Sequence, residues 1–167
     1  MKKENTALFI GNRACYGVNL ESIKEAILYA IDSGITTFLS GGQGYFDEVC
    51  AKTVYQLKES YPHIKNILMI PYKNFHIFDK TIFDEIVYPF DAYESSSLTY
   101  RNAIPERNRV MVMRSTMAIS YVYRNGGASK TFDLAQANGL EIIDFFSYTI
   151  KENIHIFNEN TNCKFLK

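Results

Sequence analysis

Two kinds of hydrophobic pattern alternate along the chain. Short runs of apolar, β-prone residues predict buried strands, and segments in which apolar residues recur every three or four positions predict amphipathic helices. Gly34 and Gly139 stand where two of these helices should end in a left-handed turn. The strands are predicted at residues 6–10, 35–39, 67–70, 85–88, 117–123 and 141–145, and the helices at 20–31, from 46 to near 62, at 105–114 and at 129–138.

This order of elements predicts the fold class. Strands that alternate with helices form βαβ units, which build a parallel sheet covered by helices on both faces. We therefore expect an α/β fold, a Rossmann-like three-layer sandwich with a mostly parallel central sheet. The pattern weakens between residues 72 and 100, and residues 146–167 are expected to form an irregular C-terminal extension. No repeat or linker divides the chain, so a single domain over residues 1–167 is predicted.

Three loops that follow predicted strands contain glycine. Residues 11–13 read GNR, residues 40–44 read SGGQG, and residues 124–131 read RNGGASKT, with Ser129 placed as the N-cap of the next helix. Glycine lets a backbone approach a ligand closely, and a helix N-terminus offers unpaired N–H groups and about half a positive charge. In a parallel sheet all three loops lie at the carboxyl edge, where ligands bind. The loops predict an anion site, although a tight turn without a ligand also explains residues 40–44.

Charge and composition restrict the partners. The chain has 18 basic and 18 acidic residues, so no global field attracts nucleic acid or an anionic membrane, and any anion site must be local. Only a cluster of arginines at 101, 107, 109 and 114 favours a nucleic-acid partner, which is therefore not expected. The apolar run near the N-terminus is too short for a signal peptide or a membrane span. A soluble, cytoplasmic protein without a membrane partner is predicted.

Cysteine and histidine chemistry is not indicated. The three cysteines are widely spaced and are interpreted as reduced thiols, and the histidines have no carboxylate partners at the spacing of a metal site. No metal and no cofactor are predicted. Several aromatic residues between 72 and 83 could stack on a base or pack on one another. The cysteines are Cys15, Cys50 and Cys163, the histidines are His63, His76 and His155, and the aromatic residues are Tyr72, Phe75, Phe78 and Phe83.

Several segments together resemble a known superfamily. FIGNR, LSGGQGYFDEVCA, LKESYPHIKNILMIPY and RNRVMVMRSTMAISYVYRNGGASKTFDLAQANGLEII, in this order, resemble the SLOG superfamily and most of all its YpsA-like branch. The superfamily also contains the DNA-processing protein DprA and the LOG phosphoribohydrolases. The resemblance covers residue 7 to about residue 143. It implies a Rossmann-like domain that binds a nucleotide or a nucleotide-derived ligand at its glycine loops, and it suggests a homodimer.

The resemblance also assigns ligand-binding residues. It implies that Arg13 and Lys130 contact phosphate, that the loop amides line phosphate or ribose, and that Asp47 accepts a ribose hydroxyl. Capping of its own helix explains Asp47 equally well, and a surface position on its helix is the alternative for Arg107. The assigned positions are Gly11, Arg13, Ser40, Gly41, Gly42, Gly44, Asp47, Arg107, Asn108, Gly126, Gly127, Ser129 and Lys130, with Met111 in the same element as Arg107 and Asn108.

Two function classes follow from this resemblance. The LOG hydrolases carry a PGGxGTxxE signature, whereas residues 125–133 read NGGASKTFD, with Asp133 in place of the glutamate. A nucleotide-binding module, acting as a sensor or ligand carrier, is favoured. The alternative is a phosphoribohydrolase or N-glycosidase in which Asp133 is the catalytic carboxylate and Arg107 holds the phosphate. In either class, Gly42→Val is expected to remove ligand binding and leave the fold intact.

Overall fold

A six-stranded parallel sheet forms the centre of the computed structural model, which describes residues 5–15, 17–90 and 101–145. Predictions for residues 91–100 and 146–167, including those for Cys163 and His155, lie outside the described residues. The strand order is β4-β3-β2-β1-β5-β6. The strands are β1 (Thr6–Gly11), β2 (Thr37–Ser40), β3 (Lys65–Met69), β4 (Glu85–Val87), β5 (Met117–Tyr121) and β6 (Glu141–Asp144).

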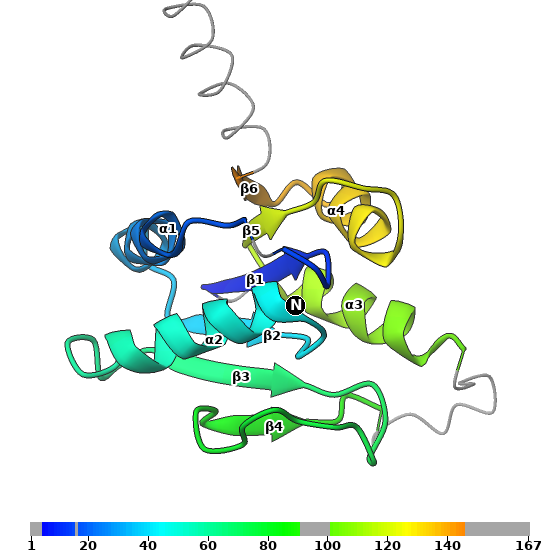
Figure 1. Ribbon diagram of the computed structural model, residues 1–167, viewed down its shortest axis with the longest axis horizontal. Helices are drawn as coiled ribbons and strands as arrows, with labels where there is room; N and C mark the ends of the chain where they lie inside the picture. Colours follow the sequence, from blue (N-terminus) through cyan, green and yellow to red (C-terminus); the bar gives the residue numbers. More distant parts are fainter. Residues whose placement is uncertain (1–4, 16, 91–100, 146–167) are drawn as a thin grey trace, which may run out of the picture.

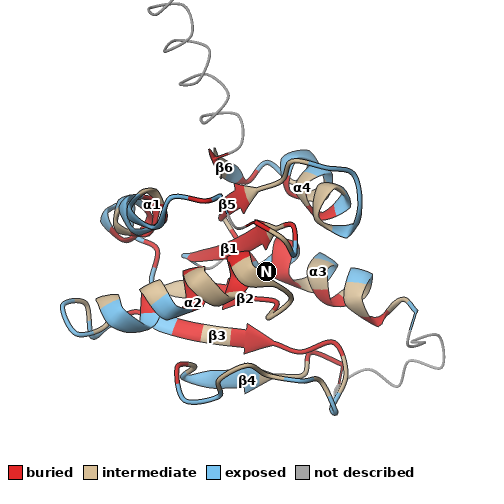
Figure 2. Ribbon diagram, viewed as in Figure 1, coloured by how far each residue is buried: buried red, intermediate tan, exposed pale blue. Residues whose placement is uncertain are grey.

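Four helices cover the two faces of this sheet, which confirms the predicted Rossmann-like three-layer fold (Figure 1). Along β1, Ala7 and Phe9 point to the core under one helix pair, and Leu8 and Ile10 point to the core under the other. β1 is therefore buried on both faces, whereas β4 at the sheet edge is largely exposed (Figure 2). The first helix pair is α1 (Leu20–Asp32) with α2 (Tyr45–Leu57), and the second is α3 (Ala103–Arg114) with α4 (Gly127–Ala137).

The chain changes direction across the sheet at β1. Ala7 pairs with Phe38 of β2 on one side and with Met117 of β5 on the other. The strands β1 to β4 run outward in one direction, and the chain then returns to place β5 and β6 on the opposite side of β1. Such a switch leaves a crevice beyond the carboxyl ends of the two central strands, here β1 and β5.

The observed element boundaries correct several details of the prediction, and the largest correction is that α2 ends at Leu57 instead of near residue 62. β2 begins at Thr37 instead of residue 35, and β3 spans Lys65–Met69 instead of 67–70. β5 ends at Tyr121, two residues early, because the amide of Tyr123 leaves the sheet and donates to the side chain of Asn12. α4 begins at Gly127.

The described helices bear on three further expectations from the sequence. Gly34 follows α1 with φ +92°, as its predicted role at a helix end requires. Leu20, which shares the periodicity of α1, is 55% exposed because it is the first residue of that helix. Among the described residues, no helix combines the length and apolar character that a membrane span requires.

Candidate functional site

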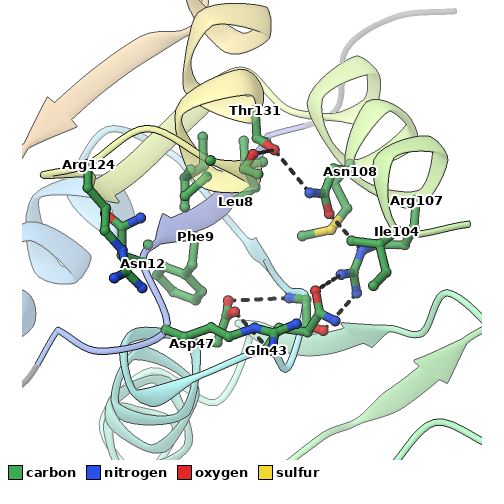
Figure 3. Close-up of a pocket in the computed structure, with 18 of the residues that line it drawn as sticks. Leu8, Phe9, Asn12, Gln43, Asp47, Ile104, Arg107, Asn108, Arg124 and Thr131 are labelled. Atoms are coloured by element: carbon green, nitrogen blue, oxygen red, sulfur yellow. Dashed lines mark hydrogen bonds between the residues drawn. The ribbon is translucent and has the colours of Figure 1, made fainter. Parts of the chain in front are cut away.

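A cavity of about 450 Å³ lies at the switch point between β1 and β5 (Figure 3). Its size is in the range of pockets that bind small molecules. Its walls come from the end of β1, the β2–α2 loop, α3, and the β5–α4 loop. The lining residues are Leu8, Phe9, Ile10, Gly11, Asn12, Arg13, Gly41, Gln43, Asp47, Ile104, Arg107, Asn108, Met111, Arg124, Asn125, Gly126, Gly127, Ala128 and Thr131.

The end of β1 is fixed by Asn12. Its backbone N–H donates to the carbonyl of Tyr121 at 3.2 Å, and its Oδ1 accepts from the amide of Tyr123 at 2.9 Å. Asn12 therefore joins the two central strands where they leave the sheet. Within the described part of the chain its Nδ2 makes no hydrogen bond, so this group is available to a ligand.

The β2–α2 loop (residues 40–44) is bonded mainly to its own chain. Asp47, in the first turn of α2, accepts from the amide of Gln43 at 3.0 Å and from that of Gly41 at 3.4 Å. The amide of Gly42 donates to Ser40 Oγ at 3.2 Å. The backbone N–H groups of Gly41, Gly42 and Gln43, which the sequence suggested as phosphate ligands, thus stabilise the loop itself.

Asp47 is buried within this arrangement. Burial raises the pKa of its carboxyl above the usual value of 3.8, while the amides of Gln43 and Gly41 and the charge of Arg107 act against the shift. The carboxylate has about four lone-pair positions, and the loop uses only some of them. Asp47 therefore anchors the loop and still presents an acceptor to the cavity that it lines.

The glycines of this region are required by packing. A Cβ on Gly44 would lie 2.5 Å from Arg13 Cα, and a Cβ on Gly11 would lie 2.5 Å from the Phe46 side chain. Gly42 has φ +67°, and its Cβ would lie 2.8 Å from Leu68 Cδ1. A valine at Gly42 is strained by the positive φ and meets a core side chain, so Gly42→Val is expected to lower the stability of the fold as well as to affect ligand binding.

Arg107 is buried beneath the same loop and is only 1% exposed. Its Nη1 donates to the carbonyls of Gly41, at 2.7 Å, and Met69. Its Nη2 donates to Gln43 Oε1 at 3.2 Å, and its Nε donates to Asn108 Oδ1 at 2.8 Å. These four bonds use four of the five N–H donors of the guanidinium.

The charge of Arg107 is retained despite its burial. Burial lowers the pKa of the guanidinium to about 10, and the Asp47 carboxylate acts against this shift. The group is thus cationic at neutral pH. The alternative of a surface arginine is wrong, and the phosphate-holding role implied by the resemblance would have to use what the chain leaves of its donors.

A line of hydrogen bonds connects Arg107 to Gly127, at the start of α4. Asn108 turns its Oδ1 to Arg107, and its Nδ2 donates to Thr131 Oγ1 at 3.0 Å. The Thr131 hydroxyl in turn donates to the carbonyl of Gly127 at 2.9 Å. α3 therefore holds the first turn of α4 in place.

The end of the β5–α4 loop (residues 122–126) and the first residue of α4, Gly127, are open. An added Cβ on Gly126 or Gly127 would meet no atom within 4 Å. The first N–H groups of a helix have no partner inside the helix, and those of Gly127 and Ala128 have none elsewhere in the described residues. The exposed Arg124 adds a cation beside this turn, on the side of the cavity where Asn12 lies (Figure 3).

Ser129 does not have its predicted position. Because Gly126 is the N-cap of α4, Ser129 is the third helical residue. Its Oγ accepts from the amide of Gly126 at 2.9 Å and donates to the carbonyl of Gly126 at 3.0 Å. The side chain therefore closes the first turn of α4 instead of capping the helix from outside.

A comparison of the sequence with known families identifies the family of the chain. The sequence model of the YspA SLOG family (YpsA) matches residues 3–142. The chain belongs to the SLOG superfamily, in its YpsA-like branch. This membership indicates a nucleotide-related function. No curated protein matches the chain significantly.

The SLOG domain brings about half of the predicted site residues together at one cavity. Gly11, Arg13, Gly41, Asp47, Arg107, Asn108, Gly126 and Gly127 line it, as does Met111. Six others do not line it, and among these Lys130 and Asp133 are exposed on α4. The six are Ser40, Gly42, Gly44, Ser129, Lys130 and Asp133. Which of the lining residues contact a ligand stays a prediction.

The cavity of the SLOG domain also has lining residues that the sequence did not single out. Asn12 and Gln43 lie inside the glycine loops, so the loop positions themselves were the available signal. Arg124 and Thr131 likewise belong to the third glycine-containing segment, whereas Ile104 had no such signal, because it reaches the cavity only through the packing of α3.

Other side chains considered from the sequence lie away from this cavity. The aromatic residues pack edge-to-face in pairs, Tyr72 with Phe75 and Phe78 with Phe83, and none of the four lines it. Cys15 and Cys50 are free thiols, and both are buried. Burial raises the pKa of Cys15 to about 11. The described residues contain no cluster of three or more metal-ligating side chains.

Proposed function

We propose that the protein binds a nucleotide or a nucleotide-derived anion in the cavity at the β1/β5 switch point. The lining supports this proposal, because it contains three arginines (Arg13, Arg107 and Arg124) and one carboxylate (Asp47) in a chain without net charge. The cavity is therefore a local site of positive potential, which favours an anionic ligand.

The open first turn of α4 is the observation that carries the proposal. Backbone amides and the dipole of a helix N-terminus bind phosphate, and the space around Gly126 and Gly127 lets phosphate oxygens approach. Arg124 lines the same part of the cavity, and arginine can hold phosphate with two parallel hydrogen bonds. We place the phosphate here.

The rest of the ligand then extends toward α3. Asp47 can accept a ribose hydroxyl, and Ile104 and Met111 supply an apolar wall for a base. The proposal is for binding, because the alternative phosphoribohydrolase lacks support at its two key positions. Asp133 is exposed outside the cavity, and Arg107 donates mainly to the chain itself.

A thermal-shift screen with mass spectrometry tests the proposed function. Inorganic pyrophosphate and the nucleoside 5′-mono- and diphosphates are added to the purified protein. Each compound that stabilises the protein is recovered, and its mass is measured by mass spectrometry. A ligand at one hundred times its Kd stabilises a protein by about 2.7 kcal/mol, which shifts Tm by several degrees. A compound recovered unchanged supports binding. Recovery of free base and ribose phosphate would contradict a role in binding alone and would support the phosphoribohydrolase.

A matched pair of glycine variants tests the position of the phosphate. Gly127→Val fills the space beside the α4 N-terminus, and Gly17→Val adds the same side chain at an exposed glycine outside the cavity that also has no atom within 4 Å. Neither change is expected to lower Tm without ligand. Gly127→Val should abolish the ligand-dependent shift and Gly17→Val should keep it. An unchanged shift in Gly127→Val would contradict the placement.

A further inference from the structure

Side-chain amides line the cavity at Asn12, Gln43 and Asn108. An amide has an acceptor oxygen and a donor NH₂ group on the same carbon, so it can offer either one to a ligand. The hydrogen bonds that it makes to the protein decide which. The orientation of each amide therefore carries information about the ligand.

The orientation of Gln43 is fixed by Arg107. A guanidinium has donors and no acceptor, so the amide must face it with its oxygen. Arg107 Nη2 lies 3.2 Å from Gln43 Oε1. The Nε2 group of Gln43 makes no hydrogen bond within the described part of the chain, and the side chain lies on the cavity wall between Asp47 and Arg107 (Figure 3).

Arg107 itself has one available arrangement. It is almost fully buried, and its other hydrogen bonds go to the carbonyls of Gly41 and Met69 and to Asn108 Oδ1. Turning the guanidinium away from Gln43 would break bonds to buried backbone groups, which is costly. Gln43 is therefore held with its NH₂ group free for the cavity.

We propose that Gln43 determines base specificity by donating to a hydrogen-bond acceptor on the base edge, with Arg107 as its positioning residue. This rests on the proposed function, which places phosphate at the α4 N-terminus beside Arg124. Gln43 lies with Arg107 and Ile104 on the side of the cavity away from Arg124 (Figure 3). A ligand that extends from the phosphate toward α3 brings its base to this side.

Two substitutions at Gln43 separate this role from a structural one. Gln43→Met removes the donors without adding a charge. Gln43→Glu still accepts from Arg107, so it keeps the loop bonded, but it presents an acceptor where the amide presented a donor. The control is Gln56→Glu, the same change of charge at an exposed position of α2 outside the cavity.

The experiment measures the Kd of inorganic pyrophosphate and of adenosine, guanosine, cytidine and uridine 5′-diphosphates for each variant. The preferred nucleotide should bind about tenfold more weakly to Gln43→Met, as expected for a lost base contact, and weaker still to Gln43→Glu. The preference among the four nucleotides should disappear in Gln43→Met. Pyrophosphate should bind Gln43→Met, and all five ligands should bind Gln56→Glu, within about twofold of the unchanged protein.

Each other outcome overturns the proposal in a distinguishable way. If Gln43→Met binds the preferred nucleotide as tightly as the unchanged protein, or keeps its preference among bases, Gln43 does not contact the base. If pyrophosphate and nucleotides weaken equally in Gln43→Met, the residue acts on the loop as a whole. If the unchanged protein binds neither pyrophosphate nor any nucleotide, the proposed function fails and base recognition fails with it.

Discussion

Two of the three glycine loops, the β2–α2 loop and the β5–α4 loop, look alike in sequence and differ in what surrounds their backbones. The backbone of the β2–α2 loop is bonded and packed by the protein itself, so we call it the filled loop. Asp47 accepts hydrogen bonds from its amides, and Arg107 donates to one of its carbonyls. Gly42 and Gly44 pack closely against neighbouring residues. The β5–α4 loop has open space at Gly126, and so does the start of α4 at Gly127. A glycine-rich turn can therefore serve the fold or a ligand, and the atoms that a Cβ would meet tell the two apart.

The largest effect is expected where the filled loop depends on one side chain. Arg107→Met leaves the carbonyls of Gly41 and Met69 buried without this donor, so we expect a loss of about 3–5 kcal/mol in the free energy of unfolding. Urea denaturation measures it. Arg109→Met, at an exposed position of the same helix, should stay within about 0.5 kcal/mol of the unchanged protein. A loss below about 1 kcal/mol for Arg107→Met would show that the loop does not depend on the hydrogen bonds of Arg107.

The next effect compares a glycine of each loop. Gly44→Ala places a Cβ against the backbone of Arg13 at φ +115°, so it should destabilise the fold by about 2–3 kcal/mol. Gly127→Ala meets no atom and should leave the urea midpoint unchanged. Equal losses in the two variants would remove the distinction between a filled and an open loop.

A smaller effect is expected within the open loop. Ser129→Ala removes the side chain that bonds the amide of Gly126, and the loss of such a terminal hydrogen bond costs about 1 kcal/mol. Thermal unfolding without ligand measures this loss. If Tm does not change, the hydrogen bonds of Thr131 hold the first turn of α4 without help from Ser129.

The smallest effect concerns the pH dependence of the filled loop. The pKa of Asp47 is raised in the folded state, so its contribution to stability is fully present below about pH 3.8 and is lost as pH rises through the folded pKa. Relative to Asp47→Asn, the unchanged protein should therefore become less stable as pH rises from about 4 to about 8. Urea denaturation of both proteins across this range measures the difference. A difference that is constant or grows with pH would contradict the raised pKa.

The sequence predicted the fold better than it predicted the site. Strand and helix periodicity records which positions are buried, so the order of elements and the parallel sheet followed from it. Boundaries were shifted where a side chain takes over a backbone bond, as Asn12 does with the amide of Tyr123. The position of Ser129 was wrong because a serine near a helix start fits both the N-cap and the third helical position.

The position of the candidate cavity could be predicted from the sequence, but the contacts of the residues that line it could not. The three glycine loops do meet at one edge of the sheet, as expected for parallel strands. The burial of Arg107 had no linear signal, because the carbonyls that it binds come from Gly41 and Met69, in loops and strands far from it in the chain. Likewise Gly11 is needed by Phe46, a contact that exists only after α2 has packed on β1.

The line of hydrogen bonds from Arg107 through Asn108 and Thr131 to Gly127 has one direction. Each donor in it has a single acceptor, so the hydrogens cannot be redistributed and neither side chain gains by rotating. Such walls are preorganised: the protein gives up little conformational entropy when a ligand enters. The freedom lost on binding is then mainly that of the ligand.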